Sequence, residues 1–420
     1  MRQLLTKCLL VLLILSLFLH LTGCTIPEYI SETTPPTDPA DAYKEDPVSY
    51  VVFTRSTGTK ETYVLITDLM EYTSKYADCN GTWFRDRLEG EDLCIYQAYL
   101  FAMENGCTGF EMYVEDADRD FNHIRQAVSL DSPFMAQNYD NSERVWSQPP
   151  NYLGERILVH LEQFTASRWE NNMQALEKCR EIVAGIPATC VTQEEKAEYL
   201  YRYVCDNVEY VSYDQVGRDD YLYDAVIEGK TFCDGYSNML NMLFNLAGIT
   251  SCEAMGSNIE NIDEATEEEL EEYSGHTWVV GILDGHFYNF DPTFDDTVEY
   301  DKGDDLWYFG FSDDLLSTKY LDLDEMRPKC TDKTRDFNYA DLIVTDVTHN
   351  PTVKSIAVLA ESKAAEGQYT ILVGVQAVVE DYEYDLFFDY VKWYVNTIDY
   401  IEIVHYDLQN ATLWELTVET

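Results

Sequence analysis

Basic residues are scarce in this chain. Its 420 residues include 28 lysines and arginines against 77 aspartates and glutamates, which gives a formal net charge of −49 at pH 7. An electrostatic field of that sign repels nucleic acids and anionic wall polymers and favours cationic partners. We therefore expect the protein to bind no nucleic acid.

Metal-binding patterns and long apolar runs are also lacking. The 11 cysteines include no Cys-x-x-Cys pair, and the 7 histidines are mostly scattered, so we expect no structural zinc site, no other metal and no cofactor. The acidic run at residues 263–272 has no ligand spacing and is expected to be a solvated loop. The apolar run at residues 9–19 is shorter than the roughly 20 residues that a transmembrane helix needs.

The N-terminus has the pattern of an export signal. Arg2 and Lys7 precede the apolar run, and Leu-Thr-Gly-Cys at residues 21–24 looks like a lipobox. Residues 1–23 are then a bacterial lipoprotein signal peptide, and lipidated Cys24 anchors the protein at the extracellular face of the cell membrane. An uncleaved anchor or an ordinary secretion signal is the alternative. Residues 24–48, acidic and rich in Pro and Thr, are expected to be a disordered tether with a reach of about 70 Å.

Nine cysteines besides Cys24 would remain after removal of the signal peptide. An odd number in an exported chain suggests four disulfides and one free nucleophile. The alternative is that several of them are reduced and buried as small apolar side chains.

The remainder of the chain is long enough for two or three domains. We expect a small N-terminal α/β domain at 49–150, a catalytic domain at 151–328 and a C-terminal α/β domain at 329–420. Within the catalytic domain, a capping box at Thr192 and Glu195 begins a helix that precedes the one expected to carry Cys233. In the C-terminal domain, strands are expected near Leu342, Leu372 and Tyr400, with helices from Pro351 and Tyr384.

A helix is predicted to begin at Cys233 and to end before Gly248, which has the position of a C′ glycine. Its apolar residues follow one another in steps of three and four, the mark of a helix with one buried stripe: Tyr236, Met239, Leu240, Leu243, Phe244 and Ala247. Cys233 is then in the first turn, where the helix dipole and free N–H groups favour an anionic thiolate. The same N–H groups can bind the oxyanion of a tetrahedral intermediate.

A β-hairpin is predicted from residues 277–283 and 286–290, joined by Asp284-Gly285 in a type I′ turn. This turn pairs Leu283 with His286 and Val279 with Phe290. By the same count, Asp291 is a diagonal neighbour of His276 on one face, about 7–8 Å away by Cα. A carboxylate there would accept a hydrogen bond from one ring nitrogen and leave the other free to take a proton.

Each of these residues also has an ordinary structural explanation. A cysteine in an exported chain is more often half of a disulfide, a histidine is more often a bonded core residue, and Asp-Pro-Thr is more often a turn. The combination, with a register that places His276 and Asp291 on one face, favours a catalytic site. The same register excludes His286, which falls on the opposite face beside the turn.

The pattern resembles the transglutaminase-like superfamily. Its Gly-x-Cys-x-Gly-Tyr segment matches Cys233, Gly235 and Tyr236, its His-Ala-Trp-Asn segment matches His276 and Trp278, and its Asp-Pro-Thr-Trp-Asp segment matches residues 291–295 with Phe294 in place of tryptophan. The resemblance implies an α+β fold with a papain-like core, a catalytic helix packed on an antiparallel sheet. It also implies Cys233 as nucleophile, His276 as base and acid, and Asp291 as the orienting residue.

The expected function is thiol acyl transfer at the cell surface, either as a peptidase or amidase or as a protein transglutaminase, on a protein or peptide substrate of the cell envelope. Tyr236 and Trp278 are candidate substrate-binding residues, as are Tyr210 and Tyr213, for which core packing is an equal alternative. A non-catalytic surface scaffold with the same fold is the second hypothesis, and a carbohydrate-binding wall protein is a weaker third. The sequence does not reveal the oligomeric state.

Overall fold

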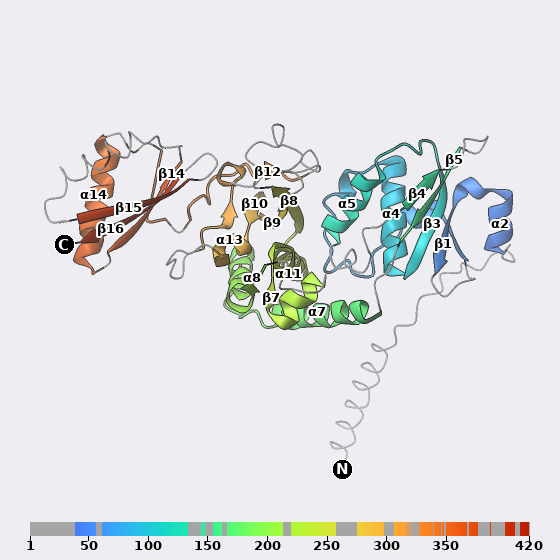
Figure 1. Cartoon of the computed structure of the whole chain (residues 1–420), viewed down its shortest axis with the longest axis horizontal. Helices are drawn as coiled ribbons and strands as arrows, with labels where there is room; N and C mark the ends of the chain where they lie inside the picture. The colour runs from blue at the N-terminus through green and yellow to red at the C-terminus, as the bar shows by residue number, and fades with distance from the viewer. Residues whose placement is uncertain are drawn as a thin grey trace, which may run out of the picture. The chain divides into compact units, whose positions relative to one another are not determined.

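The structure is a computed structural model of the whole chain (Figure 1). It describes residues 38–420 apart from 56–60, 133–143, 148–153, 162–165, 213–219, 258–274, 298–305, 317–318, 321–326, 339, 346, 348–349, 368, 377–386, 388–399, 408–411 and 420. The chain divides into two compact units, residues 1–45 and 46–420. The first contributes only the helix α2 (Pro39–Glu45) to the described residues, so the signal peptide, Cys24 and most of the tether lie outside them.

The second unit begins with a five-stranded antiparallel sheet in the order β2-β1-β3-β5-β4. The strands are β1 (Tyr50–Arg55), β2 (Glu61–Leu65), β3 (Cys107–Val114), β4 (Arg144–Ser147) and β5 (Glu155–His160). Helix α4 (Gly90–Glu104) packs against β3 and α5 (Phe121–Asp131). Three short helical segments precede α4 in the chain, namely η1 (Pro47–Ser49), α3 (Ile66–Met70) and η2 (Arg85–Arg87). We assigned β5 to the catalytic segment on sequence alone; its pairing with β3 and β4 corrects that assignment.

The central part combines helices with a second antiparallel sheet, which confirms the expected α+β class. The sheet order is β11-β10-β9-β8-β12, with β8 (Ser251–Ser257), β9 (Gly275–Leu283), β10 (His286–Phe290), β11 (Phe309–Phe311) and β12 (Lys319–Tyr320). The helices are α7 (Ala166–Ala184), α8 (Gln193–Asn207), α11 (Cys233–Leu246) and α13 (Pro292–Thr297). Shorter elements are β6 (Glu209–Tyr210), α10 (Tyr221–Tyr223), η3 (Asp224–Glu228), β7 (Lys230–Thr231) and η5 (Asp313–Leu315).

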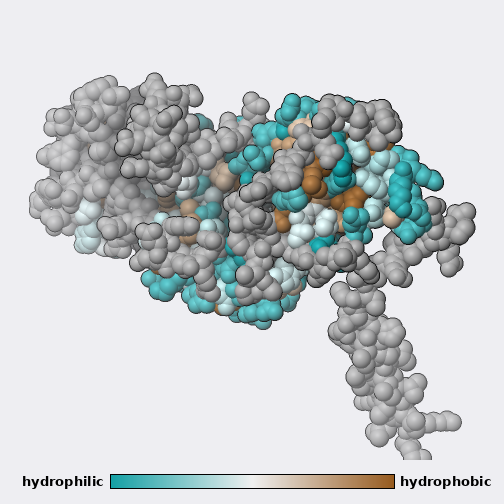
Figure 2. All heavy atoms as spheres, turned by 45° about the vertical axis from the view of Figure 1, so that its right-hand side comes forward, coloured by the Kyte–Doolittle hydropathy of each residue, from teal (hydrophilic) through white to brown (hydrophobic). Residues whose placement is uncertain are grey.

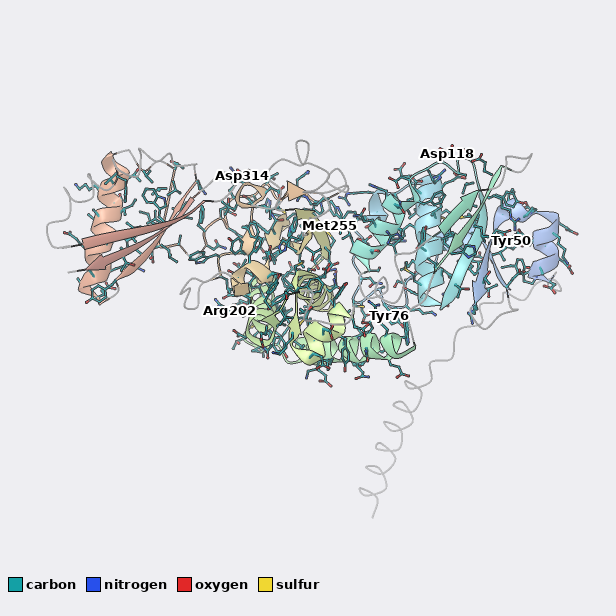
Figure 3. The ribbon with its side chains drawn as sticks, viewed as in Figure 1. Tyr50, Tyr76, Asp118, Arg202, Met255 and Asp314 are labelled. Carbon is teal, nitrogen blue, oxygen red and sulfur yellow. The ribbon has the colours of Figure 1, made fainter. Side chains whose placement is uncertain are left out.

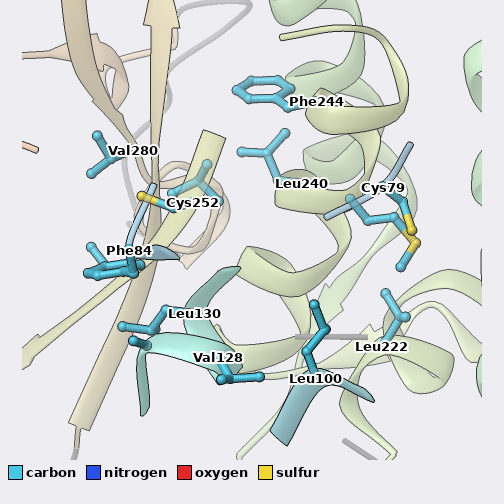
Figure 4. Close-up of a cluster of buried hydrophobic side chains, with 14 of the residues drawn as sticks. Cys79, Phe84, Leu100, Val128, Leu130, Leu222, Leu240, Phe244, Cys252 and Val280 are labelled. Atoms are coloured by element: carbon cyan, nitrogen blue, oxygen red, sulfur yellow. The ribbon is translucent and has the colours of Figure 1, made fainter. Parts of the chain in front are cut away.

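One continuous hydrophobic core serves both of these parts, from Val51 to Phe337. Figure 4 shows Leu100 and Val128, from α4 and α5, in the same cluster as Leu240 and Val280, from α11 and β9. Polar contacts accompany the packing: the side chain of Gln126 on α5 contacts Met255 on β8, one of the residues marked in Figure 3. The segments that we expected to be separate domains therefore share their buried apolar side chains.

The last part has a core of its own. A four-stranded sheet in the order β13-β14-β16-β15 carries the helix α14 (Asn350–Ala365). Its strands are β13 (Leu342–Val344), β14 (Thr370–Val375), β15 (Tyr400–Asp407) and β16 (Thr412–Glu419). The predicted strands and the helix from Pro351 are confirmed, whereas the helix expected from Tyr384 falls almost wholly outside the described residues.

Hydrophilic residues make up much of the coloured surface on the face drawn in Figure 2, with hydrophobic residues showing in patches. Among the described residues, no helix has both the length and the apolar character needed to cross a membrane.

Candidate active site

Cys233 lies at the first position of α11, as the sequence predicted. Phe232, extended at φ −119° and ψ −168°, is the N-cap residue, and Gly248 with φ 77° follows the helix end. The expected stripe of apolar side chains is buried apart from Ala247, which is partly exposed, and the polar Asn238 and Asn241 are also buried. The helix therefore sits within the core, and its first turn holds the thiol with only 8 % of the residue exposed.

Gly235 explains how the chain enters this helix so tightly. A Cβ atom built on Gly235 would lie 2.1 Å from Thr231 Oγ1 and 2.5 Å from Thr231 Cγ2. Only a glycine lets the first turn of α11 lie against the preceding strand β7. The glycine two residues after the cysteine is thus a packing requirement for the position of Cys233.

The β9–β10 hairpin has the predicted register. Asp284 and Gly285 have φ values of 51° and 84°, both positive as a type I′ turn requires. Leu283 pairs with His286, and Val279 pairs with Phe290. The ladder between the two strands ends there, and the Asp291 N–H instead donates to the Tyr308 carbonyl at 3.0 Å.

His276 and Asp291 meet as the register predicted. The Nε2 atom of His276 is 2.6 Å from Oδ2 of Asp291, with 6 % of His276 and none of Asp291 exposed. The other carboxylate oxygen of Asp291 accepts the backbone N–H of Phe294 at 3.2 Å. Both oxygens are therefore held, and the bond to His276 fixes the orientation of the imidazole.

Aromatic rings hold the imidazole on its faces. Phe294 stacks on His276 with centroids 4.5 Å apart and 13° between the planes, and Trp278 lies at 6.0 Å and 19°. Phe294 is the residue that departs from the tryptophan of the family pattern. The sequence analysis assigned Phe294 no role. Its position three residues after Asp291, where its N–H can bond the Asp291 side chain, could have suggested that its ring lies near His276.

The thiol and the imidazole lie next to each other. The Sγ atom of Cys233 is 3.9 Å from the carbonyl oxygen of Gly275, the residue before His276. Burial by itself lowers the pKa of His276, but the Asp291 carboxylate, and after it the Cys233 thiol, outweigh burial and raise this pKa to about 10. The structure thus brings the three predicted side chains together and favours a charged imidazolium beside the sulfur.

Two of the expected substrate-binding residues have structural roles instead. Tyr236 and Trp278 have no exposed surface. The Tyr236 hydroxyl bonds the Val208 carbonyl at 3.0 Å and also the Asp296 carboxylate, and Trp278 Nε1 donates to Asn289 Oδ1 at 2.9 Å. These two predictions are wrong, because the sequence pattern does not distinguish a cleft aromatic from one that fills the core behind the cleft.

Tyr210 fits the expectation of an accessible aromatic residue near the thiol. It is 44 % exposed, and its ring lies 6.4 Å from that of Tyr236. Burial, and after it the Cys233 thiol, raise the pKa of Tyr210 above its usual range. Tyr213, the other candidate, lies outside the described residues.

Asp295 organises the segment behind the site, a role that sequence analysis did not assign. Its carboxylate accepts the N–H groups of Trp307 at 2.9 Å and Tyr308 at 3.0 Å, and the Tyr201 hydroxyl at 2.6 Å. Because the Tyr308 carbonyl in turn accepts the Asp291 N–H, Asp295 fixes the backbone that presents Asp291.

The disulfide prediction is wrong. None of the nine cysteines in the described residues forms a disulfide. Most of them are buried as small apolar side chains, and burial raises the pKa of Cys94 to about 11 and that of Cys79 to about 12. An odd count fits either arrangement, so the number of cysteines could not decide between them. Within the described residues, no group of three or more His, Cys, Asp or Glu has the arrangement of a metal site.

Comparison with known proteins agrees with the expected class of fold. Residues 180–292 match the family model of the transglutaminase-like superfamily. Cys233, His276 and Asp291 all fall within this matched segment. Among curated proteins, none matches the chain.

Several solved structures are similar at low identity. One, from Cytophaga hutchinsonii and described as a candidate cysteine protease, has 12% identity over 36% of this chain and 65% of its own, with a TM-score of 0.22. A structure described as a TGase has 15% identity over 47% and 56%, with a TM-score of 0.25. The periplasmic domain of TgpA from Pseudomonas aeruginosa has 15% identity over 34% and 55%, with a TM-score of 0.22. This chain spans somewhat more than half the length of each.

Proposed function

We propose that the protein is a thiol acyl-transfer enzyme, with Cys233 as nucleophile, His276 as base and acid, and Asp291 as the residue that orients His276. The carrying observation is the 2.6 Å contact of His276 with Asp291 beside the Cys233 thiol. An imidazolium held next to a thiol stabilises the thiolate, which is the reactive form. A cysteine kept only for packing would need neither group.

The chemistry follows from these positions. The Cys233 thiolate adds to a carbonyl carbon, and the first N–H groups of α11 stabilise the oxyanion. As the C–N bond breaks, His276 gives its proton to the leaving amine, and a thioester remains on Cys233. A water molecule, or an amine, then attacks the thioester carbonyl and loses a proton to His276, and the thiolate leaves.

The acceptor decides the kind of enzyme. Water makes it a peptidase or amidase, and an amine makes it a transglutaminase. We propose hydrolysis of a protein or peptide at the cell surface as the main reaction. Tyr210 would contact the substrate, since it is exposed and lies near the thiol, and Tyr213 is proposed to do the same.

Alkylation of the native protein by iodoacetamide near neutral pH tests the proposal. We expect Cys233 to react well before the other thiols, and at least tenfold more slowly in His276→Ala. Cys205→Ala is the matched control, because Cys205 is a partly exposed cysteine that forms no disulfide. Electrophilic peptide and amine probes, compared between the wild type and Cys233→Ala, then separate hydrolysis from amine transfer.

A non-catalytic surface scaffold is the outcome that would replace this proposal. In that case Cys233 would react no faster than a free model thiol, and the rate would not change in His276→Ala. The probes would then label the wild type and Cys233→Ala equally.

We also propose that Cys24 is lipidated and holds the protein at the extracellular face of the membrane. Metabolic labelling with a fatty-acid analogue should mark the wild type and not Cys24→Ala, and the variant should leave the membrane fraction. Labelling that persists in Cys24→Ala would contradict the anchor.

A further inference from the structure

A second polar cluster lies directly behind the nucleophile, between α11 and β8. It consists of Asp234 in the first turn of α11, Asn238 in the next turn, and Glu253 on β8. The Asn238 amide donates to Glu253 Oε1 at 2.7 Å, and each of these two residues is only 5 % exposed. Asp234 is partly exposed and its Oδ2 atom lies 3.9 Å from Cys233 Sγ. The cluster thus extends from the reacting sulfur into the core.

Hydrogen-bond acceptors outnumber donors in this cluster. The negative charge of Asp234 acts on the Glu253 carboxyl group, and the Oδ1 atom of Asn238 is buried with no hydrogen-bond partner among the described residues. The single proton of the neighbouring Ser237 hydroxyl is shared among Glu253, the Asp234 carbonyl at 3.1 Å and Thr277 Oγ1 at 3.0 Å. A buried acceptor is normally satisfied, so the arrangement calls for a group that brings donors.

The pKa values of the two carboxyl groups also indicate a place for a group that brings hydrogen-bond donors and positive charge. Burial, and then the Asp234 charge, raise the pKa of Glu253 to about 8, against the hydrogen bonds of Ser237 and Asn238. Burial likewise raises the pKa of Asp234, while His276 opposes the rise. A carboxyl pair of this kind is stabilised by a cation placed between its members.

We propose that Asp234, Asn238 and Glu253 form a subsite for a cationic group of the substrate, an ammonium or a guanidinium, next to the bond that Cys233 attacks. This subsite rests on the proposed acyl-transfer function. Such a cation supplies several N–H donors to the two carboxylates and to the free amide oxygen. A calcium ion suits the cluster less well, because it takes six to eight oxygen ligands.

The cationic group could belong to the acyl donor or to the amine acceptor, and two measurements separate these sources. The first compares the inactivation of Cys233 by peptidyl chloromethyl ketones that carry a lysine, a norleucine or a glutamate side chain. The second compares cadaverine with pentylamine as acceptors for the acyl-enzyme formed from a neutral activated ester. In one of these two measurements we expect at least a tenfold preference for the reagent with the additional cationic group. That reagent is the lysine ketone in the first measurement and cadaverine in the second.

Glu253→Gln and Asp234→Asn test the residues themselves. Each keeps the shape of its side chain and removes one charge, and we expect the preference for the cation to fall at least tenfold. Glu198→Gln is the matched control, because it removes a carboxylate on α8 that pairs with Arg202 at 2.9 Å. Thermal unfolding of each variant shows whether it is folded. If one of the two is not folded, the cation preference of the other tests the subsite.

Failure of this inference differs from failure of the proposed function. Suppose that iodoacetamide alkylates Cys233 rapidly. If neither comparison then shows a preference for the cation, or if the preference persists in both variants, the proposed subsite is wrong. A proton shared by the two carboxyl groups would then explain the cluster. If Cys233 is unreactive, calorimetry of cadaverine and of lysine methyl ester with Cys233→Ala still tests the subsite. Binding that weakens at least tenfold in Cys233→Ala/Glu253→Gln would support it, and no binding would refute it.

Discussion

The protonation state of one buried imidazole decides what the site can do. His276 is only 6 % exposed, and a histidine buried in this way without a partner would be neutral at pH 7 because burial disfavours the charged form. The Asp291 carboxylate reverses that preference through a 2.6 Å contact. The chain thus holds a proton beside the Cys233 thiol at neutral pH, where the proposed reaction would need one for the leaving amine.

Replacement of Asp291 by asparagine tests this directly. Burial of His276 persists while the carboxylate is lost, so its pKa should fall from about 10 to below 6.5, the usual value for histidine. The imidazolium would then be absent at pH 7, and kcat/KM should fall on the order of 10⁴-fold. A pH titration followed by NMR of the histidine ring protons measures the shift.

A second histidine–aspartate pair, in which His286 begins β10 beside the hairpin turn, serves as the control for that measurement. His286 and Asp332 lie 3.3 Å apart, but 58 % of the His286 side chain is exposed. Asp332→Asn should leave both the His276 titration and the rate of Cys233 alkylation unchanged. An unaltered His276 titration in Asp291→Asn would show that some other group holds the proton.

At the scale of the elements, the position of Cys233 depends on the packing of Gly235 against Thr231, two residues that take no part in the proposed reaction. Gly235→Ala puts a methyl group where Thr231 already lies, at 2.1 Å from Oγ1. We expect a loss of about 1–3 kcal/mol in the free energy of unfolding and slower alkylation of Cys233, since the first turn of α11 must move away from β7. Urea unfolding and iodoacetamide kinetics measure the two effects.

A second substitution checks the cause. Thr231→Ala removes Oγ1 and Cγ2, the two closest atoms, so Thr231→Ala/Gly235→Ala should recover part of the lost stability and reactivity. Equal losses in the single and the double variant would mean that Gly235 acts by some means other than this contact.

Local signals predicted the elements that carry the site. Asp284-Gly285 fixed the hairpin register, and the cap at Thr192 begins α8 as expected. These signals work because a turn or a cap depends on a few neighbouring residues. The burial of Trp278 and the role of Asp234 depend on which element covers which face, and β8 and α11 meet only through tertiary packing. Periodicity alone carries no information on that contact.

At the scale of the whole molecule, the shared core predicts how the chain can be divided. Trp83 packs on Phe287 of β10 with ring centroids 4.6 Å apart, and Arg180 of α7 pairs with Asp78 at 2.9 Å. The segment between α3 and α4 therefore contacts the central part, and side chains of α4 and α5 belong to the same hydrophobic core as those of α11 and β9. The C-terminal sheet buries a separate set of side chains around α14.

Two deletions should thus behave differently. Deletion of residues 46–161 exposes the core that α4 and α5 cover, so we expect an insoluble protein, or one with no cooperative unfolding and no fast alkylation of Cys233. Deletion of residues 341–420 removes a unit with its own core and should leave the alkylation rate within about twofold. Thermal unfolding and iodoacetamide kinetics of both chains test this. Independent folding of residues 162–340 with full thiol reactivity would show that the N-terminal part is an accessory domain after all, and that its packing on β8 and β10 does not support the active site.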